Sequence, residues 1–253
     1  MLQVQQWILE SSIWFYFVMA PAFTLLNLFG ASCLVNVFKE RTSRHQEVPA
    51  DNTLTLEVGR TLVGTYILLV GFAGVTLYLL ARLPNISWDT ASFYNTVLGI
   101  AEVLLGYDIL FWAYHRLAHS DFFWYRVHYI HHESHSPNGL LHTLYNHPLD
   151  FILGTLCALL PLTIVPIHIL AAVICLFLQT FLIIASHSGQ KIRVPGLYNS
   201  RHHDDHHLHC WGNYAQNIAL VDMLFGTLIS SVPKPPAHEK LDKLTVDETT
   251  AGS

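Results

Sequence analysis

Residues 201–210 read RHHDDHHLHC, so five histidines and two aspartates share ten positions near the end of the chain. Neutral imidazole is a good ligand for iron, zinc and copper. A tract of this kind is typical of metal-scavenging segments of low complexity, of solvated loops and of built metal sites. The other histidines of the sequence decide which of these applies.

Three groups of histidines have the spacing of a single helix face. HRLAH carries histidines at i and i+4, whereas HYIHH and HDDHH each carry them at i, i+3 and i+4. Side chains at these spacings project from the same side of a helix. All but two of the 17 histidines lie between His115 and His209. We therefore expect short helices to converge on a metal site, with candidate ligands His115, His119, His128, His131, His132, His203, His206 and His207.

Carboxylates accompany these histidines, and ligating histidines usually donate their second ring N–H to a carboxylate or a carbonyl. Asp108 lies two helical turns before the first histidine group, and Asp204 and Asp205 lie inside the third. We expect these three residues to support the ligands, and Asp150, which follows His147, is a further candidate. Solvation of a loop is the alternative explanation for Asp204 and Asp205.

Of the nine histidines off this spacing, six are weaker candidates or none. His45 and His238 have no comparable neighbours and are expected at the surface. A packed or pore-facing position is expected for His168, while His135, His202 and His209 adjoin the motifs without sharing their spacing.

The composition predicts a membrane protein. The chain has 253 residues, of which 52% are hydrophobic and 12% charged, whereas about a quarter of residues are charged in soluble domains. Residues 13–37 and 61–81 carry no charge, and residues 93–114 carry only Glu102 and Asp108. A helix of about 20 apolar residues crosses the hydrocarbon core of a bilayer. Each of the three segments is therefore a predicted span.

Residues 151–186 form an uncharged block of 36 residues with Pro161 and Pro166 near its middle. One helix of that length would be about 54 Å long, which is too long for a single crossing. Proline breaks a helix by removing a hydrogen bond. The block is therefore predicted to be a helical hairpin with two passes of about 18 residues, which returns the chain to its starting side.

This topology places all the histidine motifs on one face of the membrane. Twelve of the 13 Lys and Arg residues lie on that face and only Arg82 lies opposite, which predicts a cytoplasmic histidine face. Asn85-Ile86-Ser87 is a glycosylation sequon on the far face, close to the membrane.

The predicted fold class is all-α: a polytopic membrane protein of three spans plus a helical hairpin, with a cytoplasmic histidine-rich helical cap. Three regions are expected along the chain. Residues 1–94 hold the N-terminal spans, residues 95–228 hold a domain with three histidine boxes, and residues 229–253 form a polar, flexible tail.

The ordered motifs HRLAH, HYIHH and HDDHH around membrane spans resemble those of the sterol desaturase/fatty acid hydroxylase superfamily. HPLD at 147–150, SHSG at 186–189 and the run SRHHDDHHLHCWGNYAQNIALVDMLFGT at 200–227 look most like the C-4 methylsterol oxidase branch. The resemblance covers about residues 95–228. It implies a fatty acid hydroxylase-type domain in a non-haem diiron, O2-dependent membrane oxygenase.

The resemblance also implies the substrate, the cofactors and the partners. An enzyme of this kind hydroxylates, oxidises or desaturates an unactivated C–H bond of a sterol, fatty acyl or terpenoid-like lipid. Electrons come from NAD(P)H through a separate donor, commonly cytochrome b5 and its reductase. Two iron ions are expected, with zinc possible in a purified form, and no nucleic acid is expected as a partner. The location would be the endoplasmic reticulum membrane if the source is eukaryotic.

By position, the resemblance extends the ligand set to His147 and His187. Some relatives have a further histidine four residues after the position of His187, where this chain has Lys191. His142, His147 or His202 could supply the missing ligand.

Two alternatives remain open from the sequence. A histidine-rich metal transporter or metal-binding membrane protein would align histidines and acids within several spans. The second alternative is a non-catalytic protein of the same fold, because Lys191 stands where some relatives have a histidine.

Overall fold

The computed structural model of the chain describes residues 2–38, 56–90, 92–133, 140–194 and 198–229. Among these residues the structure is almost entirely helical, and four helices are long and apolar enough to cross a membrane. The predicted all-α polytopic fold is confirmed. The four are α2 (Ile13–Phe38), α3 (Leu56–Leu80), α4 (Phe93–Ala118) and α9 (Ile169–Ser186).

Shorter elements precede and connect these helices. They are α1 (Leu2–Glu10), α5 (Asp121–Phe123), a π-helix (Trp124–His128), α6 (Tyr129–Glu133), α7 (Leu140–Leu144), α8 (Pro148–Leu159), a 3-10 turn (Leu160–Thr163), α10 (Arg201–His209) and α11 (Ala219–Leu224). The four short strands are β1 (Ile86–Ser87), β2 (Ile167–His168), β3 (Arg193–Val194) and β4 (Tyr198–Asn199). β1 pairs in parallel with β2, and β3 pairs antiparallel with β4.

The apolar block at 151–186 is a hairpin, but its two arms are unequal. The first arm is α8, which has 12 residues, followed by the 3-10 turn that contains Pro161. The second arm is α9, which has 18 residues and begins directly after β2. The predicted hairpin is confirmed, although its first helix is shorter than the expected 18 residues or so. The first helix ends early because Pro161 cannot donate an α-helical hydrogen bond.

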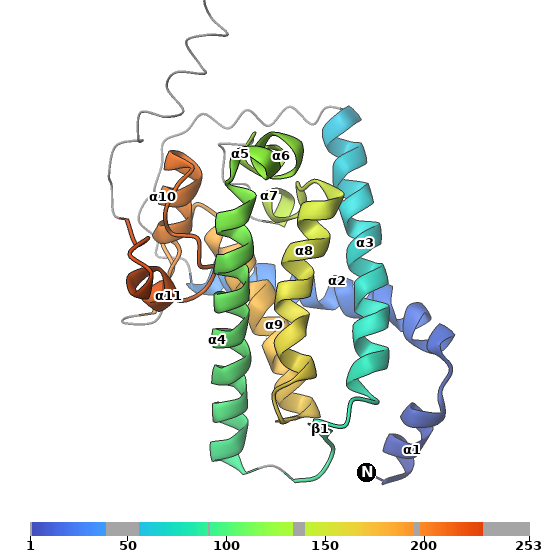
Figure 1. The fold of residues 1–253 in the computed structure, drawn as a ribbon. Coiled ribbons are helices and arrows are strands. Elements are labelled where there is room, and N and C mark those ends of the chain that lie inside the picture. Colours follow the sequence, from blue (N-terminus) through green and yellow to red (C-terminus); the bar gives the residue numbers. More distant parts are fainter. Residues whose placement is uncertain (1, 39–55, 91, 134–139, 195–197, 230–253) are drawn as a thin grey trace, which may run out of the picture.

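The tip of the hairpin is tied to the loop that follows α3. The Asn85 side-chain amide donates to the carbonyls of Leu162 (2.9 Å) and Val165 (2.8 Å), and β1 pairs with β2 beside it. Figure 1 shows β1 at one end of the helices and α5, α6, α7 and α10 at the other. The histidine motifs and the hairpin tip therefore lie at opposite ends of the molecule.

Small residues on α4 let the hairpin approach closely. A Cβ added at Gly106 would lie 3.2 Å from the Pro161 ring, and one added at Gly99 would lie 3.2 Å from Ile167. Val103, between them on the same face, is fully buried in a cluster with Leu162 and Ile167. This packing fixes α4, which carries the first histidine motif, against the hairpin that carries His187.

A second apolar cluster joins α2 to α9. Leu28 and Ala31 of α2 pack there with Phe181 and Ile184 of α9, close to the end of α9 that precedes His187. In Figure 1, α2 passes behind α8 and α9.

Of the predicted tail at 229–253, only Ile229 lies among the described residues. It is buried, and its backbone N–H donates to Asn213 Oδ1 at 2.8 Å, so Ile229 packs with the preceding domain.

Replacing Asn85 with Ala is expected to lower the free energy of unfolding by about 1–3 kcal/mol, because two carbonyls at the hairpin tip lose their donor. Thermal unfolding in detergent measures the change. The exposed Ser87→Ala variant removes the sequon but keeps Asn85, and its stability should match that of the wild type. Equal stability of Asn85→Ala and the wild type would contradict this role for Asn85.

Candidate metal centre

The end of α4 and the segment after it supply five histidines. His115 lies on α4 and His119 is its C-cap residue. The chain then turns through α5 into a π-helix that ends at His128, and α6 follows directly with His131 and His132. π-Helical segments are frequent at functional sites. This one ends at the second histidine motif, all three histidines of which are buried.

The other histidines come from α9 and α10. His187 is the C-cap residue of α9, where it follows directly on the apolar helix. His203, His206 and His207 project from one side of α10, as the i, i+3, i+4 spacing predicts. Cys210 ends α10 in the left-handed conformation, with a φ of 56°.

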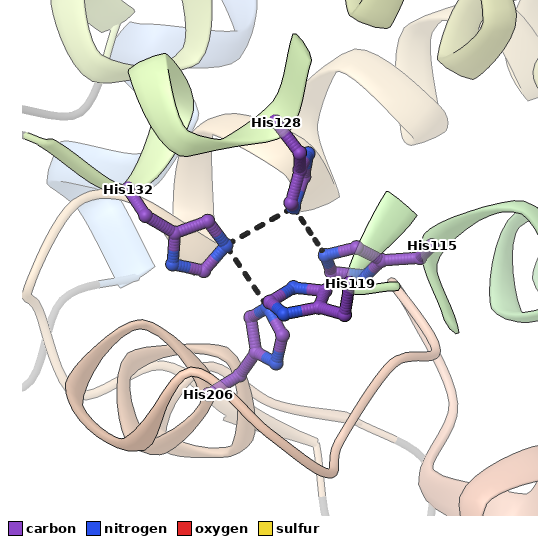
Figure 2. Close-up of side chains that lie close together, drawn as sticks. All are labelled: His115, His119, His128, His132 and His206. Carbon is purple, nitrogen blue, oxygen red and sulfur yellow. Dashed lines mark hydrogen bonds between the residues drawn. The ribbon is translucent and has the colours of Figure 1, made fainter. Parts of the chain in front are cut away.

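Two groups of histidine rings face inward with their Nε2 atoms. In cluster A, Nε2 of His128 lies 3.1 Å from those of His115 and His132, and Nε2 of His206 lies 3.2 Å from those of His132 and His119. Figure 2 shows these five rings pointing toward a common centre. Cluster A comprises His115, His119, His128, His132 and His206, whose facing nitrogens all lie within 4.8 Å of one another.

Cluster B adjoins cluster A through α6 and α10. Nε2 of His187 lies 3.1 Å from that of His131 and 3.0 Å from that of His203, and the His203 and His207 Nε2 atoms lie 3.1 Å apart. The rings of His132 in cluster A and His207 in cluster B stack at 4.3 Å. Cluster B comprises His131, His187, His203 and His207.

The outward ring nitrogens fix the tautomers. Nδ1 of His131 donates to the Tyr145 carbonyl (3.3 Å) and Nδ1 of His187 to the Ile183 carbonyl (2.8 Å), because a carbonyl oxygen only accepts. In cluster A, Nδ1 of His206 donates to the Gly212 carbonyl at 2.7 Å. A neutral ring with its proton on Nδ1 presents a lone pair at Nε2.

Burial keeps these rings neutral. It lowers the pKa of His187 to about 3, with a further contribution from His142, and burial likewise lowers the pKa of His206 to about 3. The pKa of His131 is lowered well below its ordinary value, first by burial and then by His187. The facing Nε2 atoms of His131 and His187 are therefore two lone pairs 3.1 Å apart.

Two opposed lone pairs repel each other unless a cation lies between them. Metal–imidazole nitrogen bonds are about 2.0–2.1 Å long, so neighbouring ligands at a right angle around one ion lie about 3 Å apart. The separations of 3.0–3.2 Å in both clusters match that value. The donor set therefore fits a metal ion in each cluster.

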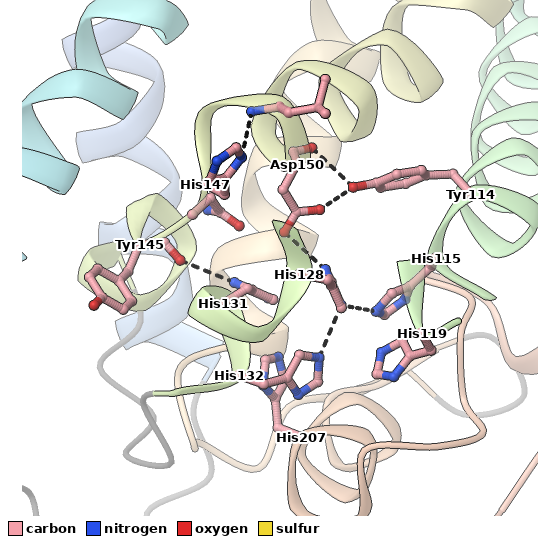
Figure 3. A network of polar contacts seen from close by, with 12 residues as sticks. Tyr114, His115, His119, His128, His131, His132, Tyr145, His147, Asp150 and His207 are labelled. Atoms are coloured by element: carbon pink, nitrogen blue, oxygen red, sulfur yellow. Dashed lines mark hydrogen bonds and ion pairs between the residues drawn. The ribbon is translucent and has the colours of Figure 1, made fainter. Parts of the chain in front are cut away.

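Asp150 is the carboxylate that contacts a clustered histidine. Its Oδ2 accepts from Nδ1 of His128 at 2.9 Å, and its Oδ1 accepts a short hydrogen bond from the Tyr114 hydroxyl. Figure 3 shows these hydrogen bonds, which link Tyr114 of α4 to Asp150 of α8 and Asp150 to His128 of cluster A. Both Asp150 and His128 are buried, so the carboxylate favours the Nδ1–H form of the ring.

Two of the three acids expected to support the ligands, Asp108 and Asp205, contact other groups. Asp108 accepts the backbone N–H groups of Asn217 (2.8 Å) and Ile218 (2.7 Å), so both of its carboxylate oxygens are bonded to the backbone. Asp205 lies 3.6 Å from Arg201, and Asp204 is buried, which raises its pKa to about 8, with Asp205 as the next cause. The spacing of these acids did not indicate their partners.

Asp108 still acts on the centre through the backbone. The segment that it holds includes Tyr214, whose carbonyl accepts from Nδ1 of His115 at 2.9 Å. Asp222 holds the same segment, because it accepts from the backbone N–H groups of Tyr214 (2.8 Å) and Ala215 (3.0 Å). Sequence reasoning missed Asp222, and its place within the run at 200–227 was the available signal.

His142 and His147 differ in where the structure places them. His142 is buried on α7, and its ring centre lies 4.8 Å from that of His207 and 5.1 Å from that of His187. Its Nε2 donates to the His131 carbonyl at 3.1 Å, which leaves the lone pair on Nδ1. His147 instead caps α8, where its Nδ1 accepts from the Leu149 N–H at 3.2 Å, and it belongs to neither cluster.

The remaining positions of interest lie outside the clusters. His168 caps α9 through its Nδ1, in the same way that His147 caps α8. His202 is half-buried on α10 and His209 lies near the end of that helix. Lys191 follows His187 by four residues and is exposed. His45, His135 and His238 lie outside the described residues.

A mostly apolar cavity reaches both clusters. Its wall includes side chains from α2, α3, α4, α8 and α9, and four histidines line it. Two of these, His115 and His128, belong to cluster A, and the other two, His131 and His187, belong to cluster B. An apolar molecule in this cavity would touch both histidine clusters without leaving the helical bundle.

Comparison with known proteins gives one family and several relatives. The sequence profile described as "Fatty acid hydroxylase" matches residues 100–227. Methylsterol monooxygenase 1 of Rattus norvegicus is 33% identical over 142 residues, which is 53% of this chain and 47% of the relative. Fatty acid hydroxylase domain-containing protein 2 of Homo sapiens is 29% identical over 146 residues, 55% of this chain and 41% of the relative.

A third relative is very-long-chain aldehyde decarbonylase GL1-11 of Oryza sativa, 28% identical over 129 residues, 47% of this chain and 48% of the relative. The chain spans about half the length of the curated relatives that it matches. No solved structure gives a significant match.

Replacing Asp150 with Asn is expected to lower the affinity of cluster A for metal about 10- to 100-fold. The amide carries no charge and can present an NH2 group to Nδ1 of His128, which favours the wrong tautomer. Competition with a chelator of known affinity measures the loss. Tyr114→Phe keeps the carboxylate and should change the affinity much less; equal affinities for Asp150→Asn and the wild type would refute the role of Asp150.

Proposed function

The chain belongs to the fatty acid hydroxylase family, and on that premise we propose that it is a membrane-bound oxidoreductase acting on a lipid. The proposed reaction hydroxylates, oxidises or desaturates an unactivated C–H bond with O2. The observation that carries the proposal is the pair of buried histidine clusters at the end of an apolar cavity.

The proposed cofactor is a pair of iron ions, one in each cluster. Cluster A supplies five imidazoles, and cluster B supplies four, to which we add His142 as the tenth ligand in place of His147. When bound, the metal pair supplies the activation of O2 that side-chain acids and bases cannot provide. The protein holds the Nε2 lone pairs in place, keeps the rings neutral and excludes water by burial.

The proposed substrate is a sterol, a fatty acyl lipid or a terpenoid-like lipid. Relatives of the chain carry the names methylsterol monooxygenase and very-long-chain aldehyde decarbonylase, so the shared domain serves more than one lipid chemistry. Electrons would come from NAD(P)H through a separate donor protein such as cytochrome b5 with its reductase. The cavity supports an apolar substrate, because most of its lining side chains are apolar.

A metal transporter is less well supported by the contacts at membrane depth. A transport path needs polar groups that are available to an ion along several spans. Asp108 accepts two backbone N–H groups, and His168 caps α9. Both groups are therefore engaged in holding the fold.

The proposed orientation places the histidine end in the cytoplasm, and in a eukaryote at the surface of the endoplasmic reticulum. Its support is the distribution of Lys and Arg between the two ends.

A cysteine introduced at the exposed Leu208, in a chain with its four native cysteines replaced, is expected to react with a membrane-impermeant maleimide from the cytoplasmic side. Asp89→Cys, near the hairpin tip, is the matched control and should react only from the opposite side. If the cysteine at position 208 reacted only from the opposite side and the cysteine at position 89 only from the cytoplasmic side, the proposed orientation would be wrong.

The purified protein is expected to bind two metal ions per chain and, with Fe(II), O2 and a reductase system, to oxidise a lipid from a membrane extract. His142→Ala should lower both metal content and turnover, by at least tenfold in turnover, because cluster B loses a ligand. Elemental analysis and mass spectrometry of the lipid products provide the two measurements.

His147→Ala is the matched control for His142→Ala. It removes only a helix cap, so it should cost about 1 kcal/mol of stability while metal content stays at two ions. Loss of metal in His147→Ala with full retention in His142→Ala would reverse the assignment of the tenth ligand. A wild-type chain that binds no metal would refute the proposed function.

A further inference from the structure

Most polar side chains on the wall of the cavity already have hydrogen-bond partners within the protein. The Thr180 hydroxyl donates to the Leu176 carbonyl at 2.9 Å, as helical threonines commonly do. The side-chain amides of Gln179 and Gln216 donate to the Ala158 carbonyl (3.3 Å) and the Ser186 hydroxyl (2.7 Å). These groups need no partner from a bound molecule.

Two cavity-lining side chains on α2 behave differently. The Thr24 hydroxyl oxygen and Asn27 Oδ1 are buried, and among the described residues neither has a hydrogen-bond partner. Thr24 is only 4% exposed. The two residues are three positions apart near the middle of α2, so they lie on the same face of that helix.

An unpaired polar group at membrane depth is costly, because no water is present there to replace a missing partner. The charged groups available in the cavity do not pair with Thr24 or Asn27. No Lys or Arg side chain lines the cavity among the described residues, and Asp150 is bonded to His128 and Tyr114. A phosphate or carboxylate headgroup would therefore find no countercharge in this cavity, whereas a neutral hydroxyl needs none.

We infer that the cavity binds a lipid alcohol, whose hydroxyl is held between Thr24 and Asn27. A hydroxyl has one donor and two acceptor sites, so it can donate to Asn27 Oδ1 and accept from the Thr24 O–H. The hydrocarbon part of the ligand then fills the apolar remainder of the cavity, which extends to both histidine clusters.

This inference rests on the proposed function only for the identification of the bound alcohol as the substrate. It assigns the choice of substrate to α2, which lies outside residues 100–227, the part that matches the family. The histidine clusters would then supply chemistry that the relatives share, while α2 selects the molecule on which it acts.

The test measures binding, without turnover, to the full chain in lipid nanodiscs. Two matched pairs serve as probes: 5α-cholestan-3β-ol with 5α-cholestane, and hexadecan-1-ol with hexadecane. A tritiated alcohol is displaced by its unlabelled alkane counterpart to give the ratio of affinities. The wild type is expected to prefer the alcohol by about tenfold in at least one pair, and Thr24→Val and Asn27→Leu should each reduce that preference about five- to tenfold.

Thr180→Val is the matched control, because it removes a cavity-lining hydroxyl that is already bonded to the backbone. Its preference for the alcohol should equal that of the wild type. Thr24→Val should also keep or raise the thermal unfolding midpoint, since it removes an unpaired buried hydroxyl; a hydroxyl with only a structural role would lower it.

Equal affinity for alcohol and alkane in both pairs, or no binding of either alcohol, would overturn the inference. Asn27→Leu provides an independent variant if Thr24→Val does not fold. A wild type that prefers the alcohol but oxidises no lipid would keep the binding site and reject the proposed function.

Discussion

The structure depends on how nine imidazole rings are held with their lone pairs facing one another in two clusters. A neutral histidine that donates from Nδ1 to a carbonyl or a carboxylate must present an unprotonated Nε2 on its other side. Ile183, Gly212, Tyr214 and Asp150 supply such acceptors from four different parts of the chain. The inward lone pairs repel, and a cation in each cluster would turn that repulsion into attraction.

The fold can hold the rings in this way because other buried polar side chains form their hydrogen bonds with the backbone and not with the histidines. Asp108 and Asp222 together accept four backbone N–H groups of residues 214–218, and so fix the segment that supports His115. At the opposite end of the molecule, Asn85 fixes the hairpin tip by donating to two of its backbone carbonyls. Buried polar side chains other than histidine therefore hold the segment at 214–218 and the hairpin tip in place.

The cavity is lined by residues inside the family match and by residues that precede it. The family match begins at residue 100, yet α2 and α3 form part of the wall that a substrate would contact. Relatives named methylsterol monooxygenase and very-long-chain aldehyde decarbonylase are similar to about half of this chain. Thr24 and Asn27 are the clearest polar features of that wall.

The sequence by itself determined the fold class and the members of the three histidine motifs. Charge-free segments of spanning length predicted the helices, and i, i+3, i+4 spacing predicted which histidines share a face, because both are local properties of a helix. Tertiary structure alone decided the partners. Among the acids that the sequence offered as supports, Asp150 contacts His128, and several backbone carbonyls that no spacing indicated hold other rings. His142 lies beside cluster B and His147 caps a helix, although both precede the same hairpin. Hydrogen bonds between residues distant in the chain depend on how helices pack, and no local pattern in the sequence encodes that packing.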